Sequence, residues 1–257
     1  MRYQNIVEGI FIERQNRFVA KVLVDGKKET VHVKNTGRCR ELLIPGCKVY
    51  LNAPTGSNRK TKYDLVAVKK LREGSEPLLI NMDSSAPNEQ AAEWLPKSGL
   101  FAPDAVIRRE VTFGNSRFDF AVFEPITAPD SCISDDNVIT GPNTQITEEK
   151  YYRTSYLEVK GVTLENDGVA MFPDAPTERG LKHVRELTEL AKKGIGAYIL
   201  FVIQMKGIRT FSPNYETHKA FGDALKQAEK AGVKILAYDS IVAENATDID
   251  SLIEIKL

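Results

Sequence analysis

The first third of the chain alternates apolar and polar residues with a period of two, a pattern that indicates β-strands. Asp25 and Gly26 provide a hairpin turn. A short helical segment at residues 38–43 is stopped by Pro45 and Gly46. The strands predicted around these breaks cover residues 6–15, 17–26, 28–35, 47–54 and 62–71. Five strands with a helix after the third are compatible with a small, partly open barrel of the OB type.

Beyond residue 82 the pattern changes to strands that alternate with strongly amphipathic helices. A short helix is expected at 88–95, and longer helices at 179–193 and 216–232. The expected strands cover residues 104–113, 116–123, 154–163, 168–173, 196–204 and 233–239. This order predicts an α/β (α+β mixed) layer architecture with a mixed sheet. We therefore predict two domains, a barrel at 1–82 and a mixed-sheet domain at 83–257.

The segment between Phe123 and Tyr151 is rich in Pro, Asp, Ser, Asn and Thr. We interpret it as a surface excursion between two strands and not as a further domain.

Charge and apolar content narrow the class of protein. The 257 residues include 35 basic and 35 acidic side chains, so polyanion binding through bulk charge is excluded and any nucleic-acid binding must come from local patches. No apolar run is long enough to span a membrane, and the N-terminal residues do not form a signal-peptide core. The three cysteines have no metal or disulfide spacing. We expect a cytoplasmic protein without membrane contact.

Two neighbouring predicted strands carry the residues with the clearest chemistry. In residues 116–123, Asp119 is expected to face away from Phe118 and Phe120, and in the next long strand Glu158 and Lys160 share one face. Two carboxylates and an ammonium on an otherwise apolar sheet would be costly unless a cation joined them. Mg²⁺ or Mn²⁺ suits Asp119 and Glu158 as ligands. The order of strands, acids and following helix is that of the PD-(D/E)xK nuclease core, in which a lysine assists phosphodiester hydrolysis.

Other residues are expected around this site. Glu93 in the preceding helix is the candidate fourth acid, with Glu89 as its competitor. Asp174 can cap the next helix. Gln204 ends a strand at a position where nuclease cores often keep a polar residue facing the site, and an ordinary polar residue at a strand end is the alternative. Cations at a helix start favour phosphate, and this helix begins with Arg179, Lys182 and His183.

The predicted barrel carries its own candidates for nucleic-acid binding. Phosphate contacts are expected from Arg38, Arg40, Lys60 and Lys62. Tyr50 and Tyr63 are candidates for stacking on bases. Lysines that protect an ordinary edge strand give the same pattern, so both interpretations stay open.

Long motifs in a fixed order resemble the sugar fermentation stimulation protein A family. They lie at residues 35–46, 116–120, 156–164, 172–187 and 209–214, so the resemblance covers nearly the whole chain. It implies an N-terminal OB-like barrel joined to a PD-(D/E)xK restriction-endonuclease-like domain. It also implies DNA binding and a role in regulating sugar metabolism, especially that of maltose. Asp119, Glu158 and Lys160 fall in the family's nuclease-like site, and Glu93 falls at its upstream helical glutamate.

Three functions therefore remain open at this point. The first is a Mg²⁺- or Mn²⁺-dependent nuclease that acts on DNA without strong sequence preference. The second is a non-enzymatic DNA-binding regulator that retains the nuclease fold, and the third is a sensor of a small ligand. Assembly as a homodimer is compatible with each.

Overall fold

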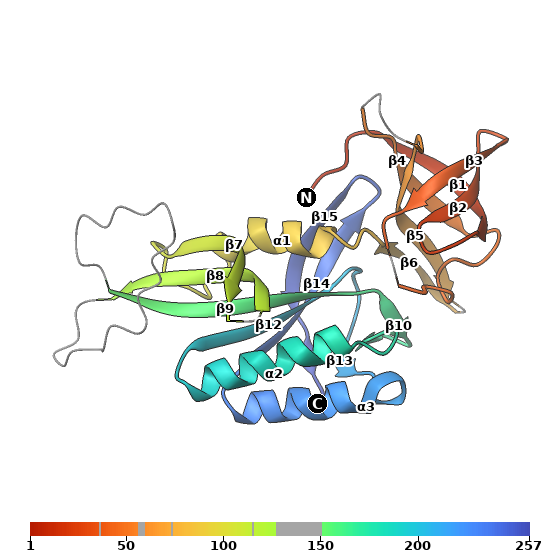
Figure 1. The fold of residues 1–257 in the computed structure, drawn as a ribbon. Helices are drawn as coiled ribbons and strands as arrows, with labels where there is room; N and C mark the ends of the chain where they lie inside the picture. Colours follow the sequence, from red (N-terminus) through yellow and green to blue (C-terminus); the bar gives the residue numbers. More distant parts are fainter. Residues whose placement is uncertain (36, 56–59, 73, 115, 127–150) are drawn as a thin grey trace.

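A computed structural model of the chain describes residues 1–35, 37–55, 60–72, 74–114, 116–126 and 151–257. The N-terminal part is a six-stranded sheet, and the C-terminal part is a larger mixed sheet with helices on both faces (Figure 1). Most of the segment between Phe123 and Tyr151 lies outside the described residues. Within the described residues, no helix combines the length and the apolar character needed to cross a lipid bilayer.

The N-terminal sheet closes into the predicted barrel because β3 pairs with β5 as well as with β2. Its strands are β1 (Ile6–Arg14), β2 (Val19–Val24), β3 (Lys27–Val33), β4 (Lys48–Asn52), β5 (Asp64–Arg72) and β6 (Ser75–Asn81). Asp25 and Gly26 form the predicted two-residue hairpin turn, with φ of 48° and 75°. Two residues at positive φ suit a type I′ turn, which matches the twist of the strands it joins.

Two details of the barrel differ from the sequence prediction. The helix expected at 38–43 is a single turn, in which the amides of Leu42 and Leu43 both donate to the Cys39 carbonyl. Cys39 has a φ of 44°, which is incompatible with an α-helix. The sixth strand, β6, was not predicted; it pairs antiparallel with β5.

The C-terminal sheet has the order β15-β14-β12-β9-β8-β7. Its centre is parallel, since β9, β12 and β14 run in one direction, while β7, β8 and β15 add antiparallel edges. The strands are β7 (Val106–Phe113), β8 (Ser116–Ile126), β9 (Tyr151–Val162), β12 (Gly196–Ile203), β14 (Lys234–Ala243) and β15 (Ala246–Leu252). A small second sheet consists of β10 (Leu164–Asn166), β11 (Val169–Phe172), β13 (Thr210–Pro213) and β16 (Glu254–Ile255).

Helices cover the two faces of the large sheet unequally (Figure 1). The long helices α2 (Glu178–Lys192) and α3 (Tyr215–Lys230) pack together on one face. Thr177 and Asn214 cap their first turns by accepting from the amides of Gly180 and Thr217. The opposite face carries only α1 (Ala86–Trp94) and the 3-10 turn η1 (Leu95–Lys97). The site residues therefore lie in a sheet that is enclosed on both sides.

The division of the chain at residue 82 stays a prediction, but the contacts across it are specific. Lys70 of β5 lies 2.6 Å from Glu165 of β10, and Lys34 lies 2.6 Å from the fully buried Asp83. Gln204 donates to the Asp83 carbonyl at 3.1 Å. These contacts place the loop after β3 against the C-terminal sheet.

Candidate metal and nuclease site

Asp119 lies where two strands separate. The ladder between β8 and β9 runs from Ile126 paired with Tyr151 as far as Phe120 paired with Leu157. One residue further along, the Asp119 carboxylate accepts a hydrogen bond from the Val159 amide at 2.7 Å. Its other oxygen accepts from the Asn88 side chain of α1 at 2.8 Å. The carboxylate is therefore fixed beside the segment that carries Glu158 and Lys160.

The separation of the strands also changes the side-chain alternation. Phe118 and Phe120 were predicted to share a face, but Phe118 packs in the core under α2 and α3, and Phe120 packs in the smaller core under α1. Opposite this point on β7, Glu110 has a φ of 56°. The regular pleat is interrupted on both strands, which a pattern of period two does not reveal.

Glu158 is buried beside a lysine and a histidine. Its side chain is 5% exposed, and its Oε1 accepts from Lys160 Nζ at 2.5 Å and contacts Nδ1 of the buried His183. The other oxygen, Oε2, is buried and has no hydrogen-bond partner among the described residues. A buried carboxylate oxygen without a partner is costly, and such an atom calls for an explanation.

The two carboxylates have opposite electrostatic surroundings. Burial raises the pKa of Asp119, and the negative charge of Glu158 raises this pKa further. Burial alone would raise the pKa of Glu158 too, but the hydrogen bond to His183 and the charge of Lys160 lower it. Glu158 is thus held ionised, while the charge of Asp119 is only partly compensated.

These residues fit a hard divalent cation that takes few protein ligands. No cluster of three His, Cys, Asp or Glu side chains suited to a metal is found within the described part of the chain. Mg²⁺ is commonly bound by one or two carboxylates, with water and phosphate oxygens as the remaining ligands. The orphan Oε2 of Glu158 and the undercompensated charge of Asp119 are the observations in favour of this fit.

The structure does not bring Glu93 to this cluster, contrary to the sequence prediction. The Glu93 side chain is 58% exposed, and its carboxylate lies 2.6 Å from the Met1 amino nitrogen. Its competitor, Glu89, pairs with Arg109 at 2.6 Å. The residue of α1 that reaches the site is Asn88, which the sequence reading missed. Pro87 indicates that Asn88 lies in the first turn of α1, but no local pattern shows that Asn88, and not Glu89 or Glu93, faces Asp119.

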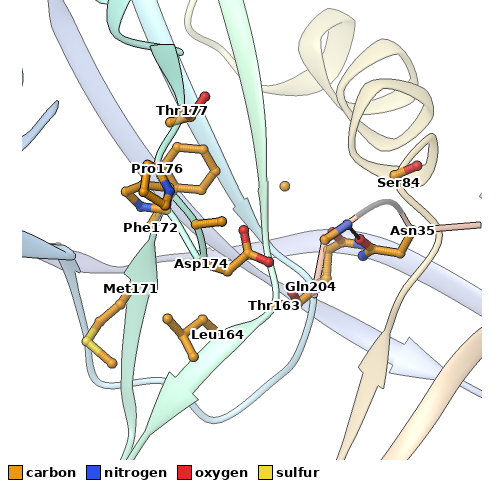
Figure 2. Close-up of a pocket in the computed structure, with 14 residues that line it drawn as sticks. Asn35, Ser84, Thr163, Leu164, Met171, Phe172, Asp174, Pro176, Thr177 and Gln204 are labelled. Atoms are coloured by element: carbon orange, nitrogen blue, oxygen red, sulfur yellow. Dashed lines mark hydrogen bonds between the residues drawn. The ribbon is translucent and has the colours of Figure 1, made fainter. Parts of the chain in front are cut away.

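The other predicted residues of the C-terminal part are divided between two places. His183 joins the cluster through Glu158, whereas Arg179 and Lys182 are exposed on α2, and Lys182 lies 3.6 Å from Glu186. Asp174 and Gln204 line a cavity beside the cluster, at the junction with the barrel (Figure 2).

The cations predicted on the barrel are all on its surface. Arg38, Arg40, Lys60 and Lys62 are exposed. Tyr50 and Tyr63 are only 4% and 5% exposed, so the expectation that they stack on bases is wrong. The Tyr63 ring packs in the barrel core. Tyr50 alternates with the core residues Val49 and Leu51, so its ring faces away from the barrel core and lies beside Glu244 of the C-terminal part.

The loop before Arg38 is organised by one side chain that the sequence reading did not single out. The Arg14 guanidinium donates to the carbonyls of Asn35, Gly37 and Arg38 at 2.6–2.8 Å, and also to two carbonyls at the β1–β2 connection. A planar group with five donors suits this role.

Comparisons with known proteins agree with this architecture. The model of the SfsA N-terminal OB domain matches residues 12–75, and that of the sugar fermentation stimulation protein RE domain matches residues 143–246. A sugar fermentation stimulation protein homolog from Desulfitobacterium hafniense is 51% identical across 100% of this chain and 99% of its own. One from Ruminiclostridium cellulolyticum is 46% identical across the full length of both chains.

A solved structure shows the same arrangement. Pyrococcus furiosus SfsA, in complex with Ca²⁺, superposes with a TM-score of 0.76 at 25% identity, covering 100% of this chain and 98% of that one. The OB-like barrel and the mixed-sheet domain are therefore shared in full. The chain belongs to the sugar fermentation stimulation protein family.

Proposed function

We propose that the protein binds DNA and hydrolyses phosphodiester bonds with Mg²⁺ or Mn²⁺ held by Asp119 and Glu158. The observation that carries the proposal is the buried Glu158 Oε2, which has no partner in the described residues and lies beside a second carboxylate. A divalent ion at such a site polarises the phosphoryl group and lowers the pKa of a water. The Ca²⁺ complex of the Pyrococcus furiosus relative supports a preference for a hard, oxygen-binding cation.

The side chains around the two carboxylates have separate tasks in this mechanism. Asn88 and the Val159 amide fix the Asp119 carboxylate from two directions. His183 holds Glu158 from the side of α2 and leaves Oε2 for the ion. Lys160 is 15% exposed, so its ammonium can reach a phosphate oxygen or orient an attacking water.

Substrate binding follows from the exposed cations of the barrel. Arg38 and Arg40 follow the loop that packs against the C-terminal sheet, and Lys60 and Lys62 precede β5. Such contacts hold the backbone of a nucleic acid without reading its sequence. The whole chain is electrically balanced, so binding depends on this local patch and weakens as salt rises.

The direct test is cleavage of labelled single-stranded and double-stranded DNA with Mg²⁺ or Mn²⁺. We expect wild-type protein to cut, and Glu158→Gln to lose cutting by at least about a hundredfold, because one of two metal ligands is gone. Glu93→Gln is the matched control, since Glu93 is exposed and outside the cluster. Absence of cutting, or equal cutting by Glu158→Gln, contradicts the proposal.

A second candidate is a DNA-binding regulator of sugar metabolism that does not cut. The observation in its favour is that Lys160 already offsets the charge of Glu158, while His183 contacts the same carboxylate oxygen. It predicts salt-sensitive DNA binding that survives Glu158→Gln and falls in a variant with Arg38, Lys60 and Lys62 changed to Glu. Cutting by the wild-type protein that requires Glu158 rules this candidate out.

A further inference from the structure

A cavity of about 320 Å³ lies beside the carboxylate cluster, between the barrel and the C-terminal sheet (Figure 2). Its volume is at the lower end of the range of small-molecule sites, ~300–1,000 Å³. Gly161, which follows Lys160 on β9, forms part of its wall. A Cβ at Gly161 would lie 2.6 Å from Gln204 Oε1, so the cavity depends on a glycine at this point. The cavity and the proposed catalytic lysine are therefore neighbours on one strand.

The walls of the cavity are apolar on one side and rich in hydrogen-bond acceptors on the other. Leu164, Met171 and Phe172 provide the apolar surface, together with two prolines of the loop before α2. Figure 2 shows the Asp174 carboxylate pointing into the cavity. The Gln204 amide nitrogen already donates to Asn81 and Asp83, which leaves its oxygen on the side of Gly161.

The charge of the lining decides which chemical class can enter. Among the described residues that line the cavity, none is Lys, Arg or His. A phosphate would meet the Asp174 carboxylate without a compensating cation, which excludes phosphate from this space. A flat, neutral ring with N–H donors on one edge fits both the apolar wall and the carboxylate.

We propose that this cavity receives an unstacked nucleobase of the substrate, and that Asp174 selects guanine. Guanine presents a ring N–H and an adjacent amino group, so it can donate two parallel hydrogen bonds to one carboxylate. Adenine and cytosine present an amino group beside an acceptor nitrogen, which would face the carboxylate unfavourably. This inference deepens the proposed function and rests on it, since the base would belong to the nucleotide next to the cut phosphate.

The proposal also restricts the form of the substrate. A base can enter the cavity only when it is out of its stack and unpaired. Single-stranded DNA or a frayed end meets this condition without the cost of opening a duplex, and unpaired bases are read on this edge. We therefore assign the cavity to a single-stranded segment.

The test measures the binding of nucleosides to the full-length protein by NMR titration in the absence of metal ions. The probes are deoxyguanosine, deoxyinosine, which lacks the amino group, and deoxyadenosine, which offers the opposite donor pattern. We expect deoxyguanosine to bind about tenfold more tightly than deoxyinosine, and deoxyadenosine to bind weakest. Asp174→Asn is expected to remove the preference, whereas Asp104→Asn, on an exposed loop, is expected to keep it.

Equal affinity for the three nucleosides, no binding of deoxyguanosine, or a preference that survives Asp174→Asn would overturn the proposal. The wild-type comparison does not depend on how well the variant folds. It also separates this inference from the proposed function, because it involves neither metal nor cutting. Metal-dependent cutting without guanine preference would refute the cavity assignment alone, and guanine binding without cutting would refute the nuclease proposal alone.

Discussion

The Val159 amide donates a hydrogen bond to the Asp119 carboxylate at 2.7 Å. The carboxylate thus takes the place of the backbone carbonyl of a neighbouring strand, which would accept this hydrogen bond in a regular sheet. This contact holds the carboxylate near the charges of Glu158, which raises its pKa, and of Lys160, which lowers it. A carboxylate in this place is costly for the fold, because it is largely buried and next to another carboxylate. A cation bound beside the carboxylate would offset this cost.

Neutralising Asp119 is expected to stabilise the metal-free protein. Because the pKa of Asp119 is raised in the folded protein, the ionised carboxylate destabilises the fold. This destabilisation develops as pH rises above about 4, the ordinary pKa of Asp. Asp119→Asn should therefore raise the Tm at pH 7 by on the order of 2 °C. The difference from wild type should shrink as pH falls, because protonation removes the buried charge of Asp119. Thermal unfolding in EDTA across this pH range measures both effects.

A divalent metal ion should make the wild-type protein more stable than Asp119→Asn, the reverse of the order expected without metal. Mn²⁺ is expected to raise the Tm of the wild-type protein, since ligands that bind only the folded state stabilise it. The same addition should leave Asp119→Asn nearly unchanged. An equal rise in both proteins would show that the ion binds elsewhere.

His183 is expected to act as a positioning residue through its contact with Glu158. His183→Ala should lower metal affinity about 10-fold to 100-fold, the usual effect of removing a group that orients a ligand. His183→Gln keeps a hydrogen-bond donor and should recover part of the affinity. Calorimetric titration with Mn²⁺ provides the comparison, and equal losses in both variants would indicate a packing role only.

The loop at residues 35–38 should depend on Arg14. Lysine at this position keeps the charge but cannot serve the five carbonyls that the guanidinium contacts. We expect Arg14→Lys to destabilise the protein by about 2 kcal/mol, because the partly buried carbonyls of Asn35 and Gly37 lose their donors. Hydrogen exchange should increase at the Gly37 amide, which donates to Asn35. Unchanged exchange there would contradict this role.

The ion pair between Lys70 and Glu165 should be a major link between barrel and sheet. The Glu165 side chain is fully buried, so Lys70→Met is expected to cost about 3 kcal/mol, as for other buried charges left without a partner. Burial alone would raise the pKa of Glu165, but the hydrogen bonds from Lys70 and Gly168 lower it.

This ion pair also predicts a pH dependence. A lowered pKa contributes stability that is present above the ordinary pKa of Glu and is lost as pH falls through the folded value. The free energy of unfolding of wild type and of Lys70→Met, from urea titrations at pH 7 and at acidic pH, should therefore converge on acidification. A constant difference would argue against an ionic role for Lys70.

Much of this fold could be predicted from the sequence, because apolar and polar residues alternate along most of its strands. The hairpin at Asp25 and Gly26 and the two amphipathic helices follow from turn chemistry and local pattern. The order of the strands also predicted that Asp119 lies near Glu158, although the shared face assigned to Phe118 and Phe120 was wrong. β15 was missed because it is an edge strand with many polar residues, which resembles a loop in sequence.

The remaining site features depend on packing between distant segments. Whether Asn88 or Glu93 reaches Asp119 is decided by how α1 lies on the sheet, and Glu93 is held instead by the Met1 amine. The turn at Cys39 is not a helix, because its backbone is held in a left-handed conformation next to the loop fixed by Arg14. Neither outcome has a signal within a short window of sequence.

Anomalous diffraction from crystals soaked in Mn²⁺ can show whether Asp119 and Glu158 together hold a divalent ion. We expect one strong Mn²⁺ peak within ligand distance of both carboxylates in the wild-type protein, and no peak there in Glu158→Gln. A wild-type crystal without density at this place, at a Mn²⁺ concentration that supports cutting, would contradict this expectation.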